Sequence, residues 1–251
     1  MLVKNFSLMQ PTFFPWIGYF LLIKETQKFC FFDTAQFSRF SWHHRNKLNI
    51  NGKELLISLP IKHLKKTCSL KEASIAEDRS INKLIKTLNQ NFPKSNLKAD
   101  ICELIKNSYF KDQNLGDANV ELIKHICEIL YIETKLFKSS ELDINLGNEN
   151  NPELKKFYQI ISIGKYLKAN YYLSPSSADY LFQEKSKNLF KNNNIQINSF
   201  EYVPNQYEKK LKNKSEVFLP YMSILDLILN NSIEYSRDFI NSQRVNINKY
   251  E

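Results

Sequence analysis

The apolar pattern of the first thirty-odd residues predicts a strand, a helix and a second strand. Residues 6–9 form a short apolar run that ends at Gln10 and Pro11. Apolar side chains recur at helical spacing over residues 16–28, and residues 29–32 form a compact run of aromatic residues and cysteine. Such an uninterrupted run is typical of a strand buried on both faces. We therefore expect the chain to begin with a βαβ unit.

Two short runs that flank Asn51-Gly52 predict a hairpin. The runs cover residues 47–50 and 54–57. Asn-Gly tolerates the positive φ angles of a tight turn, which makes it the strongest short-range hairpin signal. An antiparallel hairpin is therefore expected after the second strand.

Helical periodicity dominates the remaining chain, interrupted by short strand-like runs. The predicted helices cover residues 81–92, 96–110, 119–131, 152–167 and 178–190. The predicted strands cover residues 132–137, 171–173 and 195–203. Strands separated by helices of this length indicate an α/β fold, with a mostly parallel sheet flanked by helices in a Rossmann-like or nucleotidyltransferase-like arrangement. We expect one α/β domain over residues 1–251, with an inserted β-hairpin and a helical insertion around residues 79–131.

The composition supports a single folded unit. The chain has 251 residues, of which 43% are apolar and 24% are charged, and this balance excludes disordered and collagen-like proteins. Only five glycines and eight prolines are present, so long flexible linkers are not expected.

The net charge of +9 suits an anionic partner such as a nucleotide or a phosphate group. Nucleic acid is a less favoured partner. The densest lysine clusters, at residues 62–66 and 209–214, lack the interleaved arginine and aromatic residues of a base-stacking surface.

The cysteines, histidines and apolar stretches indicate a cytoplasmic protein without a structural metal. The four cysteines are far apart and form no C-x-x-C motif, which is typical of buried thiols in a reducing compartment. No pair of the four histidines has metal-binding helical spacing. The longest apolar stretch, residues 13–23, is too short to cross a bilayer, so no membrane contact is expected.

Polar residues that follow the predicted strands are the first candidates for chemistry, because the carboxyl ends of parallel strands share one edge of a sheet. Gln10 and Pro11 follow the first strand, within a loop that two prolines stiffen. Gly18 permits close approach at the start of the next helix, beside Tyr19. Gln10 is a candidate catalytic side chain, while the aromatic residues of this loop are equally suited to packing.

A second group of candidates follows the second strand. Asp33 and Gln36 are suited to holding hydroxyls or an ammonium group, and Arg45-Asn46 offers a planar fork for phosphate or carboxylate. His43 and His44 are candidate general bases. The alternative is that Asp33 caps the following turn and that the histidines face solvent.

The last candidates lie in the C-terminal half. Ser174 opens a serine-rich segment, residues 174–177, that is expected at a helix N-terminus and is suited to anion binding or to capping. Because G-x-S-x-G is missing, Ser-His-Asp hydrolysis is disfavoured. Ser223-x-x-Asp226 is similar to a capping box, and Asp226 is as compatible with that role as with a catalytic one.

In combination, these segments resemble the WbqC-like protein family of bacterial O-antigen and related surface-sugar gene clusters. The segments that carry the resemblance are Met9-Gln-Pro-x-Phe-x-Pro-x-x-Gly-Tyr19, Asp33-x-x-Gln36, Arg45-Asn46-Lys47, Tyr172-Leu-Ser174 with Asp179-Tyr180-Leu181, Gln206, and Leu219-Pro-x-x-Ser-Ile-Leu-Asp-Leu227.

The resemblance implies an enzyme that transfers glycine, or another aminoacyl or acyl group, to the amino group of a nucleotide-linked amino sugar. It implies a carrier-bound donor, with an acyl or peptidyl carrier protein as partner. The catalytic candidates are then Gln10, Asp33 and His44, with Asp33 or His44 as the base that deprotonates the sugar ammonium. The substrate-binding candidates are Pro11, Tyr19, Gln36, Arg45, Asn46, Ser174, Tyr180, Gln206, Ser223 and Asp226.

A looser similarity concerns the opening unit alone, which resembles the nucleotide-binding half of pantothenate synthetase. Tyr19 stands where the second histidine of a His-x-Gly-His loop would be. This similarity implies ATP as a cofactor and, as an alternative, an ATP-dependent amide ligase on the same substrates. A further alternative is a non-catalytic protein that binds a nucleotide sugar or nucleic acid.

Overall fold

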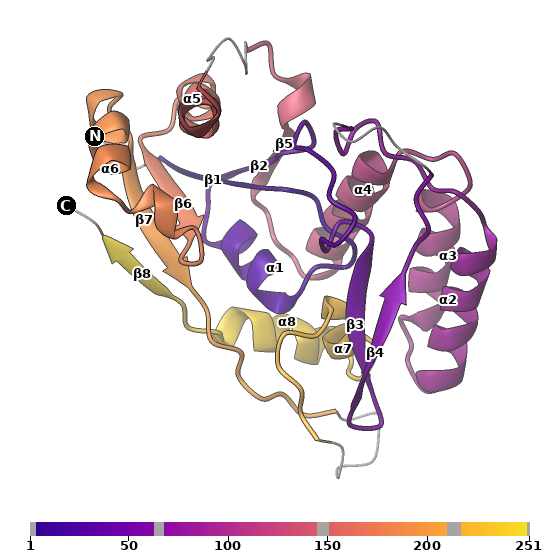
Figure 1. Ribbon diagram of the computed structural model, residues 1–251. Coiled ribbons are helices and arrows are strands. Elements are labelled where there is room, and N and C mark those ends of the chain that lie inside the picture. Colours follow the sequence, from indigo (N-terminus) through magenta and orange to yellow (C-terminus); the bar gives the residue numbers. More distant parts are fainter. Residues whose placement is uncertain (1–3, 63–67, 145–150, 210–216, 250–251) are drawn as a thin grey trace.

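The computed structural model describes residues 4–62, 68–144, 151–209 and 217–249. Within these residues, the central sheet has six strands in the order β5-β2-β1-β6-β7-β8 (Figure 1). Their bounds are β1 Asn5–Met9, β2 Lys28–Phe31, β5 Lys135–Lys138, β6 Tyr171–Pro175, β7 Gln196–Glu201 and β8 Asn246–Lys249. All neighbouring pairs are parallel except β7 and β8. The predicted α/β fold with a mostly parallel sheet is confirmed.

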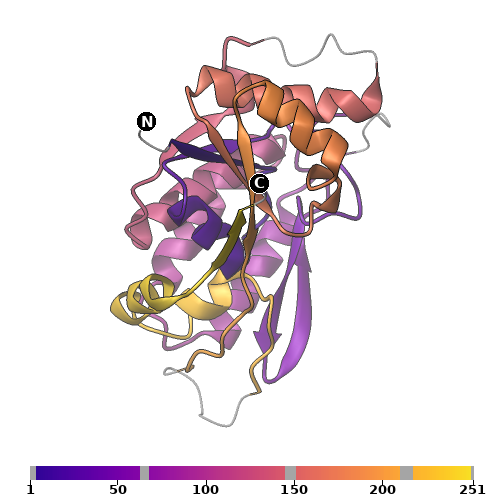
Figure 2. The same ribbon diagram turned by 90° about the vertical axis from the view of Figure 1, so that its left-hand side faces the viewer.

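Helices cover both faces of the sheet (Figures 1 and 2). The helices of one face are α5 Pro152–Tyr166 and α6 Glu184–Asn192, and those of the other are α1 Ile17–Lys24, α4 Leu115–Ile129, α7 Ile224–Ile228 and α8 Ile233–Ser242. Successive side chains of β2 point to opposite faces of the sheet. Cys30 packs with apolar side chains of α5, whereas Phe29 and Phe31 pack with those of α1 and α4. Burial on both faces explains why β2 is continuously apolar.

The predicted hairpin is confirmed as a separate two-stranded sheet made of β3 Arg45–Ile50 and β4 Lys53–Ser58. Asn51 and Gly52 have φ angles of 53° and 76°, which is the left-handed conformation that this turn requires. Leu48 and Ile57 are buried and join the main apolar cluster.

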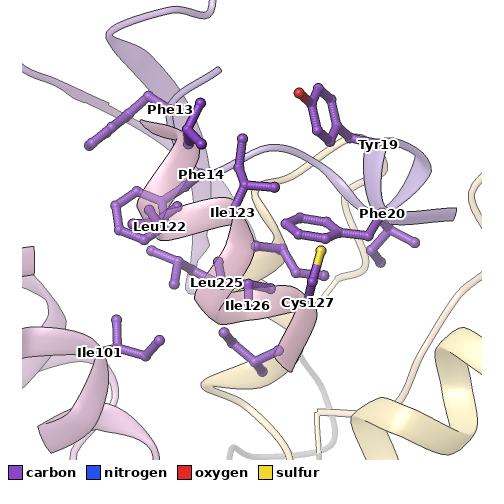
Figure 3. Close-up of a cluster of buried hydrophobic side chains, with 14 of the residues drawn as sticks. Phe13, Phe14, Tyr19, Phe20, Ile101, Leu122, Ile123, Ile126, Cys127 and Leu225 are labelled. Atoms are coloured by element: carbon purple, nitrogen blue, oxygen red, sulfur yellow. The ribbon is translucent and has the colours of Figure 1, made fainter. Parts of the chain in front are cut away.

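Three helices follow the hairpin at the predicted positions. They are α2 Arg79–Asn91, α3 Lys98–Ser108 and α4. Figure 3 shows Leu122, Ile123 and Ile126 of α4 among side chains of α1 and of the loop between β1 and α1. This packing holds the loop between β1 and α1, residues 10–16 (the Pro-rich loop), against the core.

Two parts of the C-terminal half differ from the prediction. Residues 178–190 are not one helix, because a short 3-10 turn, η2 Asp179–Leu181, precedes α6, which begins only at Glu184. Residues 174–177 therefore do not lie at the N-terminus of an α-helix. A second 3-10 turn, η1 Ser139–Glu141, follows β5.

All four cysteines are buried and free, as predicted. None of the helices in the described residues combines the length and the apolar character needed to cross a bilayer.

Candidate functional site

The order of strands reverses between β1 and β6. β1 pairs in parallel with β2 on one side and with β6 on the other, and the chain continues from these strands into opposite halves of the sheet. The loops after such strands diverge at their carboxyl ends, which opens the crevice where ligands of doubly wound sheets bind.

A cleft of about 320 Å³ lies at this switch point. Its walls come from Met9 at the end of β1, from Trp16 and Tyr19 around the start of α1, from the loop after β6, and from residues 200–203 at the end of β7, with Tyr221 beside them. The cleft thus joins segments that are more than 200 positions apart in the sequence.

Three hollows at the opposite edge of the sheet are larger than this cleft, and the two largest show where they lie. One, of about 750 Å³, is lined by Lys28 and Lys135, and the other, of about 830 Å³, by Asn170 and Gln196. These residues lie at or before the amino ends of their strands. Because sheets of this topology bind ligands at the carboxyl ends, the smaller cleft is the better candidate.

Aromatic rings form one wall of the cleft. The ring centroid of Trp16 lies 5.7 Å from that of Tyr202 and 5.2 Å from that of Tyr221. Tyr221 is 57% exposed, so its ring is open to a ligand. A Cβ atom on Gly18 would lie 2.3 Å from the Trp16 ring, so this wall requires glycine there.

The polar groups of the cleft come from two neighbouring strand ends. Glu201 is exposed at the end of β7, and Ser176 and Ser177 follow β6. The backbone N–H of Ser176 donates to the carbonyl of Phe200 over 2.8 Å, which holds the loop after β6 along the end of β7. A carboxylate and two hydroxyls next to a wall of aromatic rings are suited to a ligand that has both a planar ring and an ammonium group.

Gln10, a predicted catalytic residue, directly follows Met9 of the cleft and is held by two neighbours. Its Oε1 lies 2.8 Å from Nε2 of His43. The Tyr19 hydroxyl donates to the Gln10 carbonyl over 3.1 Å. Burial raises the pKa of Tyr19 well above its ordinary value, so this hydroxyl remains a donor.

His43 is neutral and has a defined tautomer. Its Nδ1 accepts from the backbone N–H of Ser38 over 3.4 Å, so Nε2 carries the proton and donates to Gln10. Burial, and next the neighbouring His44, lower the pKa of His43 to about 4. The Gln10 oxygen is thereby engaged, and the exposed Gln10 side chain has its amide NH₂ available as a donor.

Asp33 is not available as the general base, which corrects that prediction. The residue is 1% exposed. Its Oδ1 accepts from the Ser139 hydroxyl over 2.7 Å and from the Ser140 backbone N–H over 2.9 Å, and its Oδ2 accepts from the Ser140 hydroxyl. Asp33 therefore joins the ends of β2 and β5, a structural role that it plays at the 3-10 turn after β5 and not in the turn that follows Asp33 itself.

Asn46 and Pro11 also hold the Pro-rich loop and do not line the cleft, so they are corrected as ligand contacts. The Nδ2 of Asn46 donates to the carbonyls of Phe13 and Phe14 over 3.0 and 2.6 Å. The carbonyl of Pro11 accepts from Nδ2 of Asn119 over 3.2 Å.

Three further predicted residues are buried at structural positions, which corrects their assignment as ligand contacts. Ser174 is fully buried, and the Ser223 hydroxyl accepts from the N–H of Leu225 over 3.2 Å and caps α7. Asp226 is fully buried as well, 3.2 Å from Nζ of Lys209 and 2.5 Å from the hydroxyl of Tyr207. Such a buried pair stabilises only when both partners are present.

The remaining predicted residues lie outside the cleft. The Arg45 guanidinium lies 5.7 Å from the centroid of the Trp42 ring and donates to the carbonyl of Phe40. Tyr180 packs over Phe157 with ring centroids 6.0 Å apart. The predicted residues Gln36, His44, Arg45, Tyr180 and Gln206 are not among those lining the cleft, and Gln10 adjoins the cleft through Met9 without lining it.

Sequence reasoning missed Trp16, Glu201, Tyr202 and Tyr221. Trp16 lies inside the Pro-rich motif, so its position next to Gly18 was a usable signal. Glu201 and Tyr202 lie among the last residues of the strand predicted over 195–203, so they could have been found at the carboxyl end of a predicted parallel strand. Tyr221 carried no signal, because only the fold brings its loop to this edge.

Comparisons with known proteins identify the family of the chain. The model of the WbqC-like protein family matches residues 10–238. The chain belongs to this family. It is 26% identical over 235 residues to the uncharacterized protein Rv1507c of Mycobacterium tuberculosis strain H37Rv, covering 91% of this chain and 94% of that protein. No solved structure gives a significant match.

The expected absence of a metal site and the two lysine clusters can be examined only in the residues that the structure describes. In the described ranges, no three His, Cys, Asp or Glu side chains are grouped so that they could hold a metal ion. Most of the two lysine clusters, residues 63–66 and 210–214, lies outside the described residues.

Proposed function

We propose that this WbqC-like protein transfers an acyl or aminoacyl group, such as glycyl, to the amino group of a nucleotide-linked amino sugar in surface-polysaccharide biosynthesis. The observation that carries the proposal is the aromatic cleft at the switch point between β1 and β6. Sheets of this topology bind nucleotides at that position. We place the reaction in the cytoplasm.

The wall of Trp16, Tyr202 and Tyr221 supports the nucleotide part of the substrate. Stacking of a base on an aromatic side chain contributes about 1–3 kcal/mol. Exposed Tyr221 supplies a free ring edge or face, while buried Tyr202 fixes the position of Trp16. The hydroxyls of Ser176 and Ser177 are suited to the phosphate oxygens.

Glu201 supports an ammonium-bearing substrate. An ammonium group is attracted to its exposed carboxylate, and a carboxylate can accept the proton that the amine must lose before it acts as a nucleophile. Glu201 thus replaces Asp33 and His44 as the candidate base.

The proposed reaction is the aminolysis of an activated acyl donor. The neutral amine attacks the acyl carbon of a thioester or ester donor, a C–N bond forms, and the bond from that carbon to the donor sulfur or oxygen breaks. The proton taken from the amine passes to the departing thiolate or alkoxide. The amide NH₂ of Gln10, oriented by His43, is suited to stabilising the negative oxygen that develops on the acyl carbonyl.

Mass spectrometry of the sugar nucleotide tests the proposal. Incubation of the protein with a dTDP-linked amino sugar and a glycyl thioester is expected to add one glycyl group, and Glu201→Gln is expected to remove most of this activity. Product formation only with free glycine and ATP, together with release of pyrophosphate or ADP, would indicate the ligase instead. Binding of the sugar nucleotide without turnover by any donor would indicate a binding protein.

A further inference from the structure

A second hollow, of about 430 Å³, lies beside the loop that follows β2. Its lining comes from the β2–β3 loop, the end of β4 and the start of α2, and none of these residues lines the aromatic cleft. Three backbone hydrogen bonds hold the segments around this hollow in place. The N–H of Leu59 donates to the carbonyl of His44 over 2.8 Å, the N–H of Ala76 to the carbonyl of Pro60 over 2.9 Å, and the N–H of Lys62 to the carbonyl of Ser74 over 3.0 Å.

The polar lining of this hollow is basic. Arg39, Lys62 and His44 contribute nitrogen donors or acceptors, and Ser58 and Ser80 contribute hydroxyls. The acids nearest to these groups are Asp112, which pairs with Lys62, Glu77, which accepts from the Ser80 hydroxyl over 3.3 Å, and Asp78, which accepts from the backbone N–H of Lys111 over 2.6 Å. None of these acids is among the residues that line the hollow, so cations outnumber anions on its walls.

The first turn of α2 also contributes to the hollow, through Ser80. The N-cap residue, Asp78, makes no side-chain hydrogen bond to the helix. The N–H groups at the start of a helix have no partners within the helix and favour an anion. This effect adds to the positive charge of Arg39 and Lys62.

His44 supplies an observation that is independent of the helix. Its Nδ1 is buried and has no hydrogen-bond partner in the described part of the chain. Burial, and next the charge of Arg45, lower the pKa of this ring. An anion next to the ring would favour its protonated form, which links anion binding to the titration of His44.

We propose that this hollow binds the phosphoryl group of a phosphorylated small molecule, whose apolar part lies on Phe37, Leu59 and Pro60. The guanidinium of Arg39 matches the geometry of phosphate oxygens, and the N–H groups at the start of α2 and the hydroxyl of Ser58 at the end of β4 provide further donors. Binding at this hollow needs no reaction in the aromatic cleft, so it can be measured whether or not the protein transfers acyl groups.

The test uses pyrophosphate as the probe and follows the histidine ring signals by NMR. Pyrophosphate is expected to shift the signals of His44 and to raise its pKa, while His125, outside the hollow, stays unchanged. Arg39→Gln/Lys62→Gln is expected to weaken binding about tenfold or more. Malonate, a dicarboxylate, is expected to bind more weakly than pyrophosphate, and equal binding would contradict the preference for phosphoryl groups.

Two variants separate site binding from general charge and from misfolding. Lys86→Gln/Lys106→Gln changes the net charge equally at exposed helix positions and is expected to retain affinity. Ser80→Asp places a carboxylate at the start of α2, where it is compatible with the helix but repels the anion, so binding is expected to be lost without a lower melting temperature. Equal loss in both double variants, or unchanged His44 signals at saturating pyrophosphate, would overturn the proposal.

Discussion

The Nε2 atom of His43 lies 2.8 Å from Oε1 of Gln10, and this contact sets both the tautomer of the histidine and the direction of the amide. The two residues are 33 positions apart, at the ends of different loops. A neutral histidine used in this way orients a partner and does not exchange protons with substrate. Its effect on function is therefore expected to be distinct from that of a general base.

The stability of the protein is expected to depend on the titration of His43. Burial lowers its pKa from 6.5 to about 4, so the unfolded chain binds more protons between these values. The free energy of unfolding is therefore highest above pH 6.5. It decreases as the pH falls from 6.5 through about 4, by roughly 3 kcal/mol in total. Urea unfolding of the wild type and of His43→Gln across the window measures the difference. Parallel pH dependences in both proteins would contradict the burial of a neutral His43.

The exposed ring of Tyr221 is expected to contribute to ligand affinity and little to stability. Tyr221→Ala should weaken binding of a dTDP-sugar by about 1–3 kcal/mol, because a stacking surface is removed. Isothermal titration calorimetry gives the affinity and thermal denaturation gives the stability. The matched control is Tyr166→Ala, which removes an exposed tyrosine of α5 that is 46% exposed and outside the cleft. A similar loss in the control would argue against a specific role for Tyr221.

Gly18 is expected to be indispensable for the position of Trp16. Gly18→Ala adds a Cβ atom where the indole now lies, at 2.3 Å, so the ring must move. We expect a changed tryptophan fluorescence spectrum and weaker dTDP-sugar binding. In Trp16→Ala/Gly18→Ala the clash is absent, so the alanine at position 18 should cost no stability relative to Trp16→Ala alone. A destabilising effect of equal size in both backgrounds would show that the indole is not the obstacle.

Asp33 is expected to be important for folding. Asp33→Ala leaves two buried serine hydroxyls and a backbone N–H without their acceptor, and we expect a loss of about 2–5 kcal/mol. Denaturant unfolding measures this loss, and affinity for the sugar nucleotide, measured where the variant is folded, should be retained. A stable variant without affinity would restore Asp33 to the ligand site.

Much of the fold could be predicted because its signals are local. Asn51-Gly52 determines the hairpin through the φ angles that the turn needs, and the continuous run in β2 reflects burial on both faces. The start of α6 was misplaced because the segment after Ser174 contains good capping residues, whereas the chain uses them in a turn beside β7.

The candidate site was less predictable because its partners are distant in sequence. The position of Gln10 at a strand end predicted that it lies beside the cleft, next to Met9. The partners of Asp33, which decide whether it is a base or a structural acceptor, lie more than 100 positions away in η1. Tyr221 reaches the cleft through the β-bridge of Trp16 with Ser223, a contact without any periodic signature.

The most direct test is a crystal structure of the protein with a dTDP-linked amino sugar. We predict that the base stacks on the wall formed by Trp16 and Tyr221, with the sugar ammonium within hydrogen-bond distance of Glu201. Density for the ligand at the amino ends of the strands, next to Lys28 or Gln196, with an empty cleft between β1 and β6, would contradict the proposed function.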